Sequence, residues 1–469
     1  MLFTSPVFLF WFLPCVITIY FLLPHIKLKN LLLLISGLFF YAWGEPYFVF
    51  VMIFVSLVSY IASLIIQNIK QKKIRIFFVF IACAIQTAIL IRFKYTDFII
   101  QSVNSIFKTE FNLTYQVLPI GISFFTFQAM SYVFDVYFGE KAQKNPLNVI
   151  LYISLFPQLI AGPIVRYSQI EKEITLRKTD LCDITYGVMR FMSGFIKKTL
   201  IANQMAIIAD RAYNMPPADM SSAFAFLGAF SYFLQIYYDF SGYSDMATGL
   251  GLIFGFHFPE NFNYPYVSSS ITEFWRRWHM SLSSWFRDYV YIPLGGSRKG
   301  RKRLILNLFV VWLLTGIWHG AGFNYIVWGM YYFLLLLVEK FYVKPAKSNT
   351  GTFLRTVLTA FLVMTGWVFF RSENLNYAFA YLKAMFSFKD GIFSGQARFY
   401  INEYLPFLLA GTVFSFPIYK KAEKYFEEKG GFFEFIYSLI TGGTILYLFY
   451  VSVIYIIKGA YNPFIYFNF

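Results

Sequence analysis

His319 is the residue whose type and place in the sequence most clearly suggest chemistry. It lies in "TGIWHGAGFNYIVWG" (315–329), just after a run from Leu304 to Ile317 that is almost wholly apolar. Ionisable groups at membrane depth are costly and usually line a site or pathway, and a neutral imidazole is a suitable general base near pH 7. A helix that begins at Leu304 would carry His319 roughly 22 Å along its axis, within reach of a cavity open to the outer side. The alternative is a histidine that only bonds a neighbouring helix.

The other polar candidates give weaker signals. His279, in "EFWRRWHMSLSSWF", lies among tryptophans, where a packed interfacial histidine is the more usual interpretation. Asp239 and Asp245, in "YYDFSGYSDMATG", are carboxylates that we expect to be buried. For them, capping of broken helix ends and catalysis are equally good interpretations. His257 and His25 give no functional signal.

Several classes of chemistry are excluded by what the sequence lacks. Three cysteines provide no disulfide framework, and the chain contains no CxxC, HExxH, P-loop or GxSxG pattern. With four histidines, we predict no metal site. The net charge of +16 resides largely in short loops between apolar runs, which follows the positive-inside rule and argues against a nucleic-acid partner.

The elements that must position these residues are membrane helices. Of the 469 residues, 58% are hydrophobic and only 14% are charged, and the apolar runs approach the length of a bilayer span. We predict an all-α multipass protein with roughly 11 to 13 membrane segments of about 20 residues each. The N-terminal run has no basic region or cleavage site before or after it, so we interpret it as the first span and not as a signal peptide.

The basic loops set the predicted topology. With these loops on the cytoplasmic side, both chain ends lie on the outer side. The predicted segments are 7–23, 31–44, 47–66 and 76–93 in the N-terminal part, and 304–319, 323–341, 353–370, 404–419 and 434–457 in the C-terminal part.

The threading is unclear between residues 149 and 297, where prolines and glycines interrupt the apolar runs. Pro157, Gly162-Pro163 and "DFSGYSDMATGLG" predict re-entrant or short helices there. Residues 268–296 are too polar to span, and Ser270 with Glu273 has the spacing of a capping box. We predict that this segment is an amphipathic interfacial or re-entrant helix, with an apolar stripe formed by Trp275, Trp278, Leu282, Trp285 and Tyr289.

A basic run before the predicted 304–319 helix is a candidate for steering an anionic cytoplasmic donor. Such a donor would be a coenzyme A phosphate or an acidic carrier protein. Membrane topology alone would also explain these charges. The residues are Arg298, Lys299, Arg301, Lys302 and Arg303.

Five long motifs together resemble one family. They are "LPIGISFFTFQAMSYVFDVYFGE" (118–140), "LFPQLIAGPIVRY" (155–167), "QIYYDFSGYSDMATGLGLIFGFHFPENFNYPY" (235–266), "SITEFWRRWHMSLSSWFRDYVYIPLGG" (270–296) and "IWHGAGFNYIVWG" (317–329). They resemble the membrane-bound O-acyltransferase (MBOAT) superfamily, in its bacterial alginate O-acetyltransferase-type branch. The resemblance covers nearly the whole chain as one domain and implies tilted helices around a funnel or tunnel. It implies that His319 is the catalytic histidine and that His279 belongs to a second histidine motif.

The chain end resembles the same family. Phe464, Tyr466, Phe467 and Phe469 in "PFIYFNF" match the tail pattern FxYFxF (464–469), which in D-alanylation systems resides on a separate small protein. The tail follows a segment that threads outward, and the pKa of a phenol, about 10, lies between those of a thiol, about 8.5, and a sugar hydroxyl. These points predict Tyr466 as an acyl relay. Anchoring of the tail in the membrane interface by its aromatic rings is the alternative.

The implied activity is O-acyl transfer, most simply O-acetyl transfer, to an extracytoplasmic polysaccharide or cell-wall polymer. The donor would be acetyl-CoA or another acyl thioester, with no bound cofactor, and the partner an extracytoplasmic SGNH-hydrolase-like acyltransferase. The expected location is the bacterial cell membrane. D-alanyl transfer to teichoic acid, a lipid-linked sugar flippase and a scaffold for other acyltransferases are the alternatives. The sequence does not identify the polymer.

Overall fold

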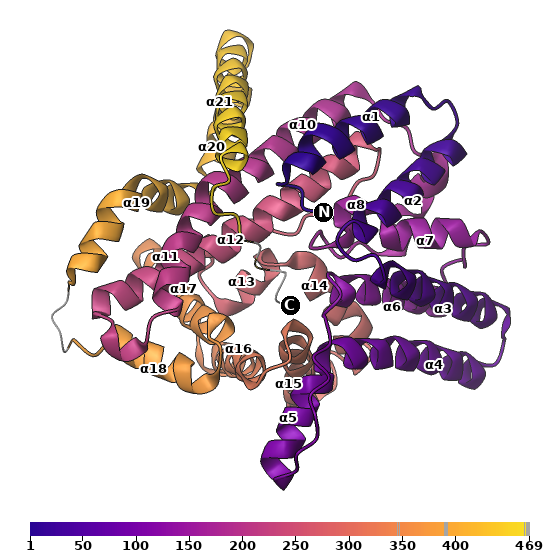
Figure 1. Ribbon diagram of the computed structural model, residues 1–469, viewed down its shortest axis with the longest axis horizontal. Helices are drawn as coiled ribbons and strands as arrows, with labels where there is room; N and C mark the ends of the chain where they lie inside the picture. Colours follow the sequence, from indigo (N-terminus) through magenta and orange to yellow (C-terminus); the bar gives the residue numbers. More distant parts are fainter. Residues whose placement is uncertain (345, 347, 389–392, 464, 466–469) are drawn as a thin grey trace. The chain divides into compact units, whose positions relative to one another are not determined.

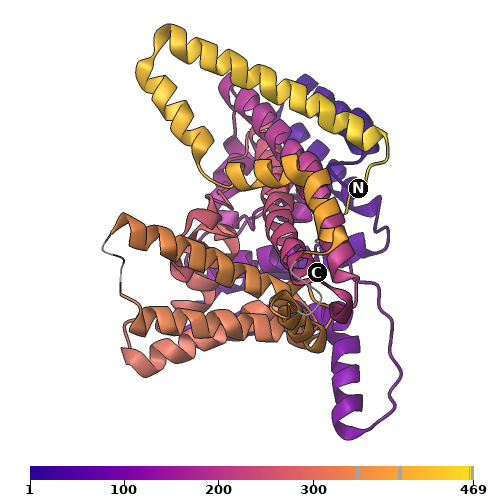
Figure 2. The same cartoon turned by 90° about the vertical axis from the view of Figure 1, so that its left-hand side faces the viewer.

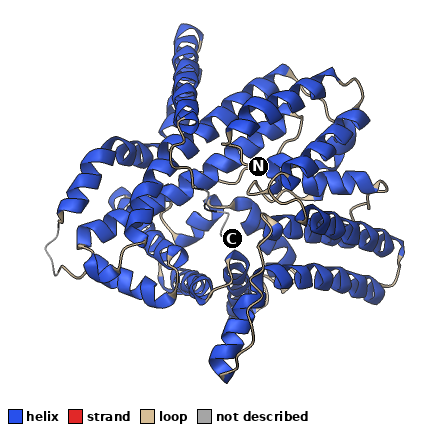
Figure 3. Cartoon of the chain, viewed as in Figure 1, coloured by secondary structure: helices blue, strands red, loops and turns tan. Residues whose placement is uncertain are grey.

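The apolar runs of the sequence fold as helices (Figure 3). The regular secondary structure of the described residues consists of helices. The computed structural model describes residues 1–469 except 345, 347, 389–392, 464 and 466–469. The described residues form two compact units, Met1–Phe191 with Met246–Pro259, and Met192–Asp245 with Glu260–Ile465. The predicted all-α class is confirmed, and the single-domain assignment stays a prediction.

The first unit contains the N-terminal helices (Figure 1). They are η1 (Phe8–Phe12), α1 (Leu13–Leu22), α2 (Ile26–Ala42), α3 (Phe48–Asn68), α4 (Lys72–Leu90), η2 (Ile91–Tyr95), α5 (Thr96–Phe107), α6 (Ile122–Phe138), α7 (Pro146–Ser154), α8 (Phe156–Leu159) and α9 (Tyr167–Leu176). Two helices, α10 (Leu181–Ile196) and α12 (Ser222–Ile253), contribute residues to both units.

The second unit contains the C-terminal helices. They are η3 (Lys197–Ala202), α11 (Asn203–Tyr213), η4 (Pro217–Asp219), η5 (Pro265–Val267), α13 (Ile271–Arg277), α14 (Met280–Phe286), η6 (Arg287–Tyr291), α15 (Gly300–His319), α16 (Phe323–Tyr342), α17 (Asn349–Arg371), α18 (Leu375–Met385), α19 (Gly395–Phe414), α20 (Ile418–Lys429) and α21 (Gly431–Ile457). Figure 2 shows α20 and α21 as the yellow hairpin near the chain end.

Each predicted segment of the two outer parts overlaps a helix, although the helix at 404–419 is displaced toward the N-terminus, because α19 runs from Gly395 to Phe414. Within the described residues, five helices are long and apolar enough to cross a bilayer. They are Phe48–Asn68, Lys72–Phe107, Phe323–Tyr342, Asn349–Arg371 and Gly431–Ile457. The protein is therefore a multipass membrane protein, and the number of 11 to 13 segments stays a prediction.

Helix α6 forms the centre of the first unit. Almost every residue from Ile122 to Val133 is buried, and α6 packs against α3, α4, α7 and α9. A helix that is apolar on all sides is expected in such a central position. The predicted breaks at Pro157 and Gly162-Pro163 are present, because α8 is only four residues long and the chain after it is irregular.

The predicted break at "DFSGYSDMATGLG" is wrong, because α12 runs through it without interruption. The glycines serve close packing. A Cβ on Gly242 would lie 2.7 Å from the carbonyl oxygen of Gly194, and a Cβ on Gly249 would lie 2.7 Å from the amide nitrogen of Phe191. Small residues let two helix backbones approach closely, as they do here between α12 and α10.

Candidate active site

His319 is the last residue of α15 and is buried, with 6% of its surface exposed. The helix ends here because Gly320 continues in an extended conformation. A Cβ on Gly320 would overlap the ring of Tyr325, and one on Gly316 would lie 2.6 Å from the carbonyl oxygen of Tyr325. Glycine at these two positions therefore allows α16 to fold back tightly against α15 and fixes the position of His319.

An aromatic wall surrounds the His319 imidazole. Trp328 on α16 and Phe370 on α17 both meet the ring edge-on, with centroids 4.9 and 5.2 Å away. The preceding residue, Trp318, is 4.8 Å away. This enclosure holds the imidazole in a low-dielectric environment, where a base interacts more strongly with charge that develops during a reaction.

Residues 268–296 do not form the single amphipathic helix that the apolar stripe predicted. The segment is divided into α13, α14 and the π-helical turn η6, and it breaks at Trp278 and His279. The predicted helix start at Ser270 is correct, since its Oγ accepts a hydrogen bond from the amide of Glu273. His279 has φ 44° and ψ 54°, a left-handed conformation that disfavours helix continuation in a non-glycine residue.

A polar network from a distant segment holds His279 at this break. Asn261 Oδ1 accepts hydrogen bonds from the Ser281 amide at 3.3 Å and the Ser281 hydroxyl at 2.8 Å. His279 Nδ1 lies 3.0 Å from the same Oδ1, and Asn261 Nδ2 donates to the Ser244 hydroxyl at 3.0 Å. Because a backbone amide can only donate, Oδ1 is assigned as the acceptor and His279 Nδ1 must carry the ring proton. Nε2 is then the nitrogen that can accept a proton.

Burial keeps the His279 imidazole neutral. Only 2% of the residue is exposed, and burial lowers the pKa of His279 to about 3. Phe240 meets the ring edge-on at 4.7 Å. His279 is therefore a fixed neutral tautomer, which suits a hydrogen-bonding or positioning role more than a group that changes charge near pH 7.

The two histidines share one aromatic neighbour. The indole of Trp318 is 6.1 Å from the His279 ring and 4.8 Å from the His319 ring. The structure thus brings together two sequence-predicted residues that are separated by 40 positions. A reacting group near Trp318 would encounter both imidazoles.

The basic run lies at the opposite end of α15 from His319. Arg298, Lys299, Arg301 and Lys302 are exposed, and Arg303 donates from Nε to the carbonyl oxygen of Leu294 at 2.8 Å. The first and last residues of α15 are nineteen positions apart, which corresponds to a distance of roughly 28 Å along the helix axis. These residues do not reach the histidines, and steering of a donor by them stays a prediction.

The two aspartates of α12 form ion pairs inside an unbroken helix, so capping of a broken helix end, one of the two interpretations given for them, is wrong. Asp239 Oδ1 lies 2.6 Å from Lys198 Nζ, with side chains 1% and 4% exposed. Asp245 pairs with Lys197 at 2.6 Å, with side chains 18% and 34% exposed. Both aspartates lie inside the helix because α12 does not break.

The buried pair contacts the residues that precede the chain end. Lys198 Nζ donates to the carbonyl oxygen of Pro463, and Asp239 Oδ2 accepts from the amide of Ile465 at 3.1 Å. Asn203 Nδ2 donates to Asn462 Oδ1 at 3.2 Å. Tyr461 is anchored in the same unit by another aspartate, since its hydroxyl donates to Asp210 Oδ2 at 2.6 Å while Arg371 Nη2 donates to Asp210 Oδ1 at 2.7 Å.

The tail pattern itself lies mostly outside the described residues. Of 464–469, the structure describes only Ile465. The predicted relay residue Tyr466 is outside the described part, so its role stays a prediction.

His257 belongs to an exposed ion cluster within the first unit. Its Nδ1 lies 2.8 Å from Glu173 Oε1, and its Nε2 lies 3.3 Å from Asp183 Oδ2. Partial burial lowers the pKa of His257, but the hydrogen bonds and charges of Glu173 and Asp183 outweigh burial and raise the pKa above its ordinary value. His25 precedes α2 as its N-terminal flanking residue.

Sequence reasoning assigned no role to Asn261, Lys198 or Asn203. Asn261 lies in the quoted motif "FPENFNYP", where an amide among aromatic residues was the available signal. Lys197 and Lys198 are two adjacent charges in a stretch that is otherwise mostly apolar, and a buried charge is unusual unless it is paired. The sequence around Asn261 or Lys198 does not predict which residue either one contacts, because the contacting residues are distant in sequence.

Comparison with known proteins gives one family. The model of the MBOAT, membrane-bound O-acyltransferase, family matches residues 63–380, which include both histidines. A probable alginate O-acetylase AlgI of Pseudomonas putida is 38% identical over the full length of both chains. A peptidoglycan O-acetyltransferase of Helicobacter pylori is 34% identical over 82% of this chain and 80% of its own length. A teichoic acid D-alanyltransferase of Bacillus subtilis is 31% identical over 55% of this chain and 70% of its own.

Proposed function

The chain belongs to the membrane-bound O-acyltransferase family, and we propose that it transfers an O-acetyl group from a cytoplasmic thioester to an extracytoplasmic polysaccharide. Of the three relatives named above, the two that match more than four fifths of this chain are an O-acetylase and an O-acetyltransferase, which favours acetyl over D-alanyl transfer. Alginate is the first candidate polymer, because the relative matched over its full length is a probable alginate O-acetylase.

The observation that carries the proposal is the pair of buried histidines at Trp318. In the proposed reaction, His319 takes the proton of the attacking hydroxyl as that oxygen bonds to the thioester carbonyl carbon. The carbon–sulfur bond then breaks, and the proton passes to the departing thiolate to give a free thiol. His279, neutral and held by Asn261, is proposed as a hydrogen-bonding group beside the reacting centre.

Tyr466 is proposed to provide the first attacking hydroxyl. Its phenol would form an acetyl ester with release of the thiol, and a polymer hydroxyl, presented by an extracytoplasmic acyltransferase, would then displace the phenol. The hydrogen bonds of residues 461–463 and of Ile465 within the unit that contains both histidines support this proposal. The proposed orientation, with both chain ends outside, puts the tail on the side of the polymer.

The test is replacement of His319 with glutamine. The amide of glutamine is polar and similar in size to the imidazole, but it cannot act as a base near pH 7. Polymer acetylation should fall by a factor of about 10²–10⁴, the usual contribution of a positioned general base. Membrane insertion and the amount of protein are measured in parallel. Acetylation near the wild-type level with normal protein amounts would contradict the assignment.

A matched control is His257→Gln, the same substitution at a histidine outside the site. It should leave acetylation within about twofold of wild type, because its partners Glu173 and Asp183 lie in an exposed cluster. Equal loss in both variants would show that the effect of His319→Gln comes from folding.

A further inference from the structure

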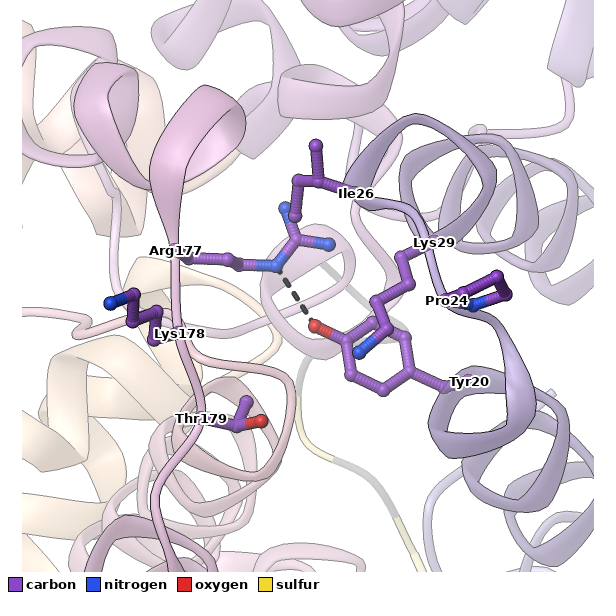
Figure 4. A pocket seen from close by; sticks show the side chains of 7 residues that line it. All are labelled: Tyr20, Pro24, Ile26, Lys29, Arg177, Lys178 and Thr179. Carbon is purple, nitrogen blue, oxygen red and sulfur yellow. Dashed lines mark hydrogen bonds between the residues drawn. The ribbon is translucent and has the colours of Figure 1, made fainter.

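A cavity in the first unit is lined by basic residues. It has a volume of about 340 Å³ and lies between the end of α1, the start of α2 and the segment that follows α9 (Figure 4). Its cations are Lys29, Arg177 and Lys178, and no aspartate or glutamate lines it. Three cations around one cavity repel one another unless an anion compensates them.

Neutral partners hold Arg177 in place. Its Nε donates to the Tyr20 hydroxyl at 3.0 Å and to the carbonyl oxygen of Phe254 at 2.9 Å. Its Nη1 donates to Asn30 Oδ1 at 2.6 Å and to the carbonyl oxygen of Glu173 at 3.3 Å. These bonds orient the guanidinium without neutralising its charge.

The carboxylate of Glu173 is engaged elsewhere. Its Oε1 lies 2.8 Å from His257 Nδ1 and its Oε2 accepts from the His257 amide at 3.1 Å, whereas the hydrogen bond from Arg177 goes to the backbone carbonyl of Glu173. Within the described part of the chain, no carboxylate forms an ion pair with Lys29, Arg177 or Lys178. Burial lowers the pKa of Arg177, and Tyr20 and the charge of Glu173 offset this effect only in part. An anion in the cavity would supply the missing charge.

Lys29 reaches the same tyrosine from α2. Its ammonium lies 4.7 Å from the centre of the Tyr20 ring, so Tyr20 contacts one cation with its face and another with its hydroxyl (Figure 4). The aromatic contact leaves the three N–H donors of Lys29 available to a ligand. Beside the cavity, Leu22 is 76% exposed and Phe21 is 42% exposed, as expected for residues that contact acyl chains.

We propose that this cavity binds a phosphate group. A guanidinium and two ammonium groups match phosphate in charge and in hydrogen-bond donors. Nη2 of Arg177 takes part in none of the four bonds described above, so its N–H groups can donate to the phosphate. The group can come from the headgroup of an anionic lipid or from a soluble phosphate ester such as coenzyme A. Binding of a lipid headgroup does not depend on the proposed acyl transfer, whereas binding of coenzyme A rests on that proposed function.

The test measures binding to the purified full-length protein with two pairs of probes. Native mass spectrometry compares retention of phosphatidylglycerol with that of diacylglycerol with the same acyl chains, which has no phosphate. Calorimetry in lipid-free detergent compares coenzyme A with pantetheine, which has no phosphate. Preference for phosphatidylglycerol alone identifies a lipid headgroup as the source, and preference for coenzyme A identifies a soluble phosphate.

The site variant is Lys29→Gln/Lys178→Gln, and the matched control is Lys27→Gln/Lys172→Gln. The control removes the same charge from the same two regions, at exposed lysines that do not line the cavity. The site variant should weaken binding of the preferred probe at least tenfold, since a charge-assisted hydrogen bond contributes about that factor or more. The control should change it less than twofold.

Two results would overturn the proposal: neither phosphate probe is preferred, or both double variants weaken binding equally. Binding is measured without turnover, so it fails or succeeds separately from the proposed function. Phosphate binding without polymer acetylation would support the site and contradict the acyl transfer. Acetylation without phosphate preference would contradict the site alone.

Discussion

Replacing Lys198 with methionine tests whether the buried ion pair positions the chain end or only stabilises the unit. The substitution keeps the length of the side chain but leaves the Asp239 carboxylate, 1% exposed, without its partner at 2.6 Å. Removing one member of a buried pair costs about 3–5 kcal/mol. A domain has a free energy of unfolding of about 5–15 kcal/mol, so Lys198→Met should lower the unfolding temperature clearly.

The double variant Lys198→Met/Asp239→Leu separates the two roles. Removing both charges together is often neutral or even stabilising, so the double variant should recover most of the lost stability. It does not restore the hydrogen bond that Lys198 donates to the Pro463 carbonyl or the one that the Ile465 amide donates to Asp239. We therefore expect stability to return and polymer acetylation to stay low, because the residues before the tail lose their anchor.

The assays are thermal unfolding in detergent micelles and acetylation of polymer by cells that carry each variant. The control is Lys197→Met, at the neighbouring lysine, whose pair with Asp245 is partly exposed. It should cost at most about 1 kcal/mol and leave acetylation unchanged. If the double variant regains acetylation together with stability, the pair does not position the tail.

Four further predictions test separate features. Tyr466→Phe keeps the aromatic ring but removes the hydroxyl, so polymer acetylation should disappear while acyl-donor hydrolysis survives; normal acetylation would reduce the tail to an anchor. His257 has a raised pKa, so its stabilising pairs are fully present below pH 6.5 and disappear as the pH rises through the folded-state pKa. Wild type should thus unfold at a higher temperature than His257→Gln at pH 6, and the difference should vanish at high pH. Cysteines at 44–46 should react with a label added outside the cell, and those at 298–303 should not, or the proposed orientation is inverted. Gly249→Val should destabilise the protein by at least about 1–3 kcal/mol, since its Cβ would press on the backbone of α10; an unchanged unfolding temperature would contradict this packing.

The sequence by itself determined the helical class and the positions of the outer segments, and it predicted His319 as the catalytic histidine, which stays a prediction. These features depend on local hydrophobicity, which a bilayer selects directly, and on one ionisable residue in an apolar run. The cap at Ser270 was predictable for the same reason, since its acceptor and donor are three residues apart. The motifs that resemble the family added its identity.

Only the tertiary structure decided where the chain breaks and which charges pair. The apolar stripe in 268–296 predicted one helix, but Asn261, distant in sequence, bonds His279 and Ser281 at the break. The glycines of 239–251 predicted a break, but the backbone of α10 packs against two of them and the helix continues. The spacing of residues along the chain predicts the conformation of a single helix. Contacts between helices depend on which distant groups meet, and burial makes those contacts decisive because an unpaired polar group inside the protein is costly.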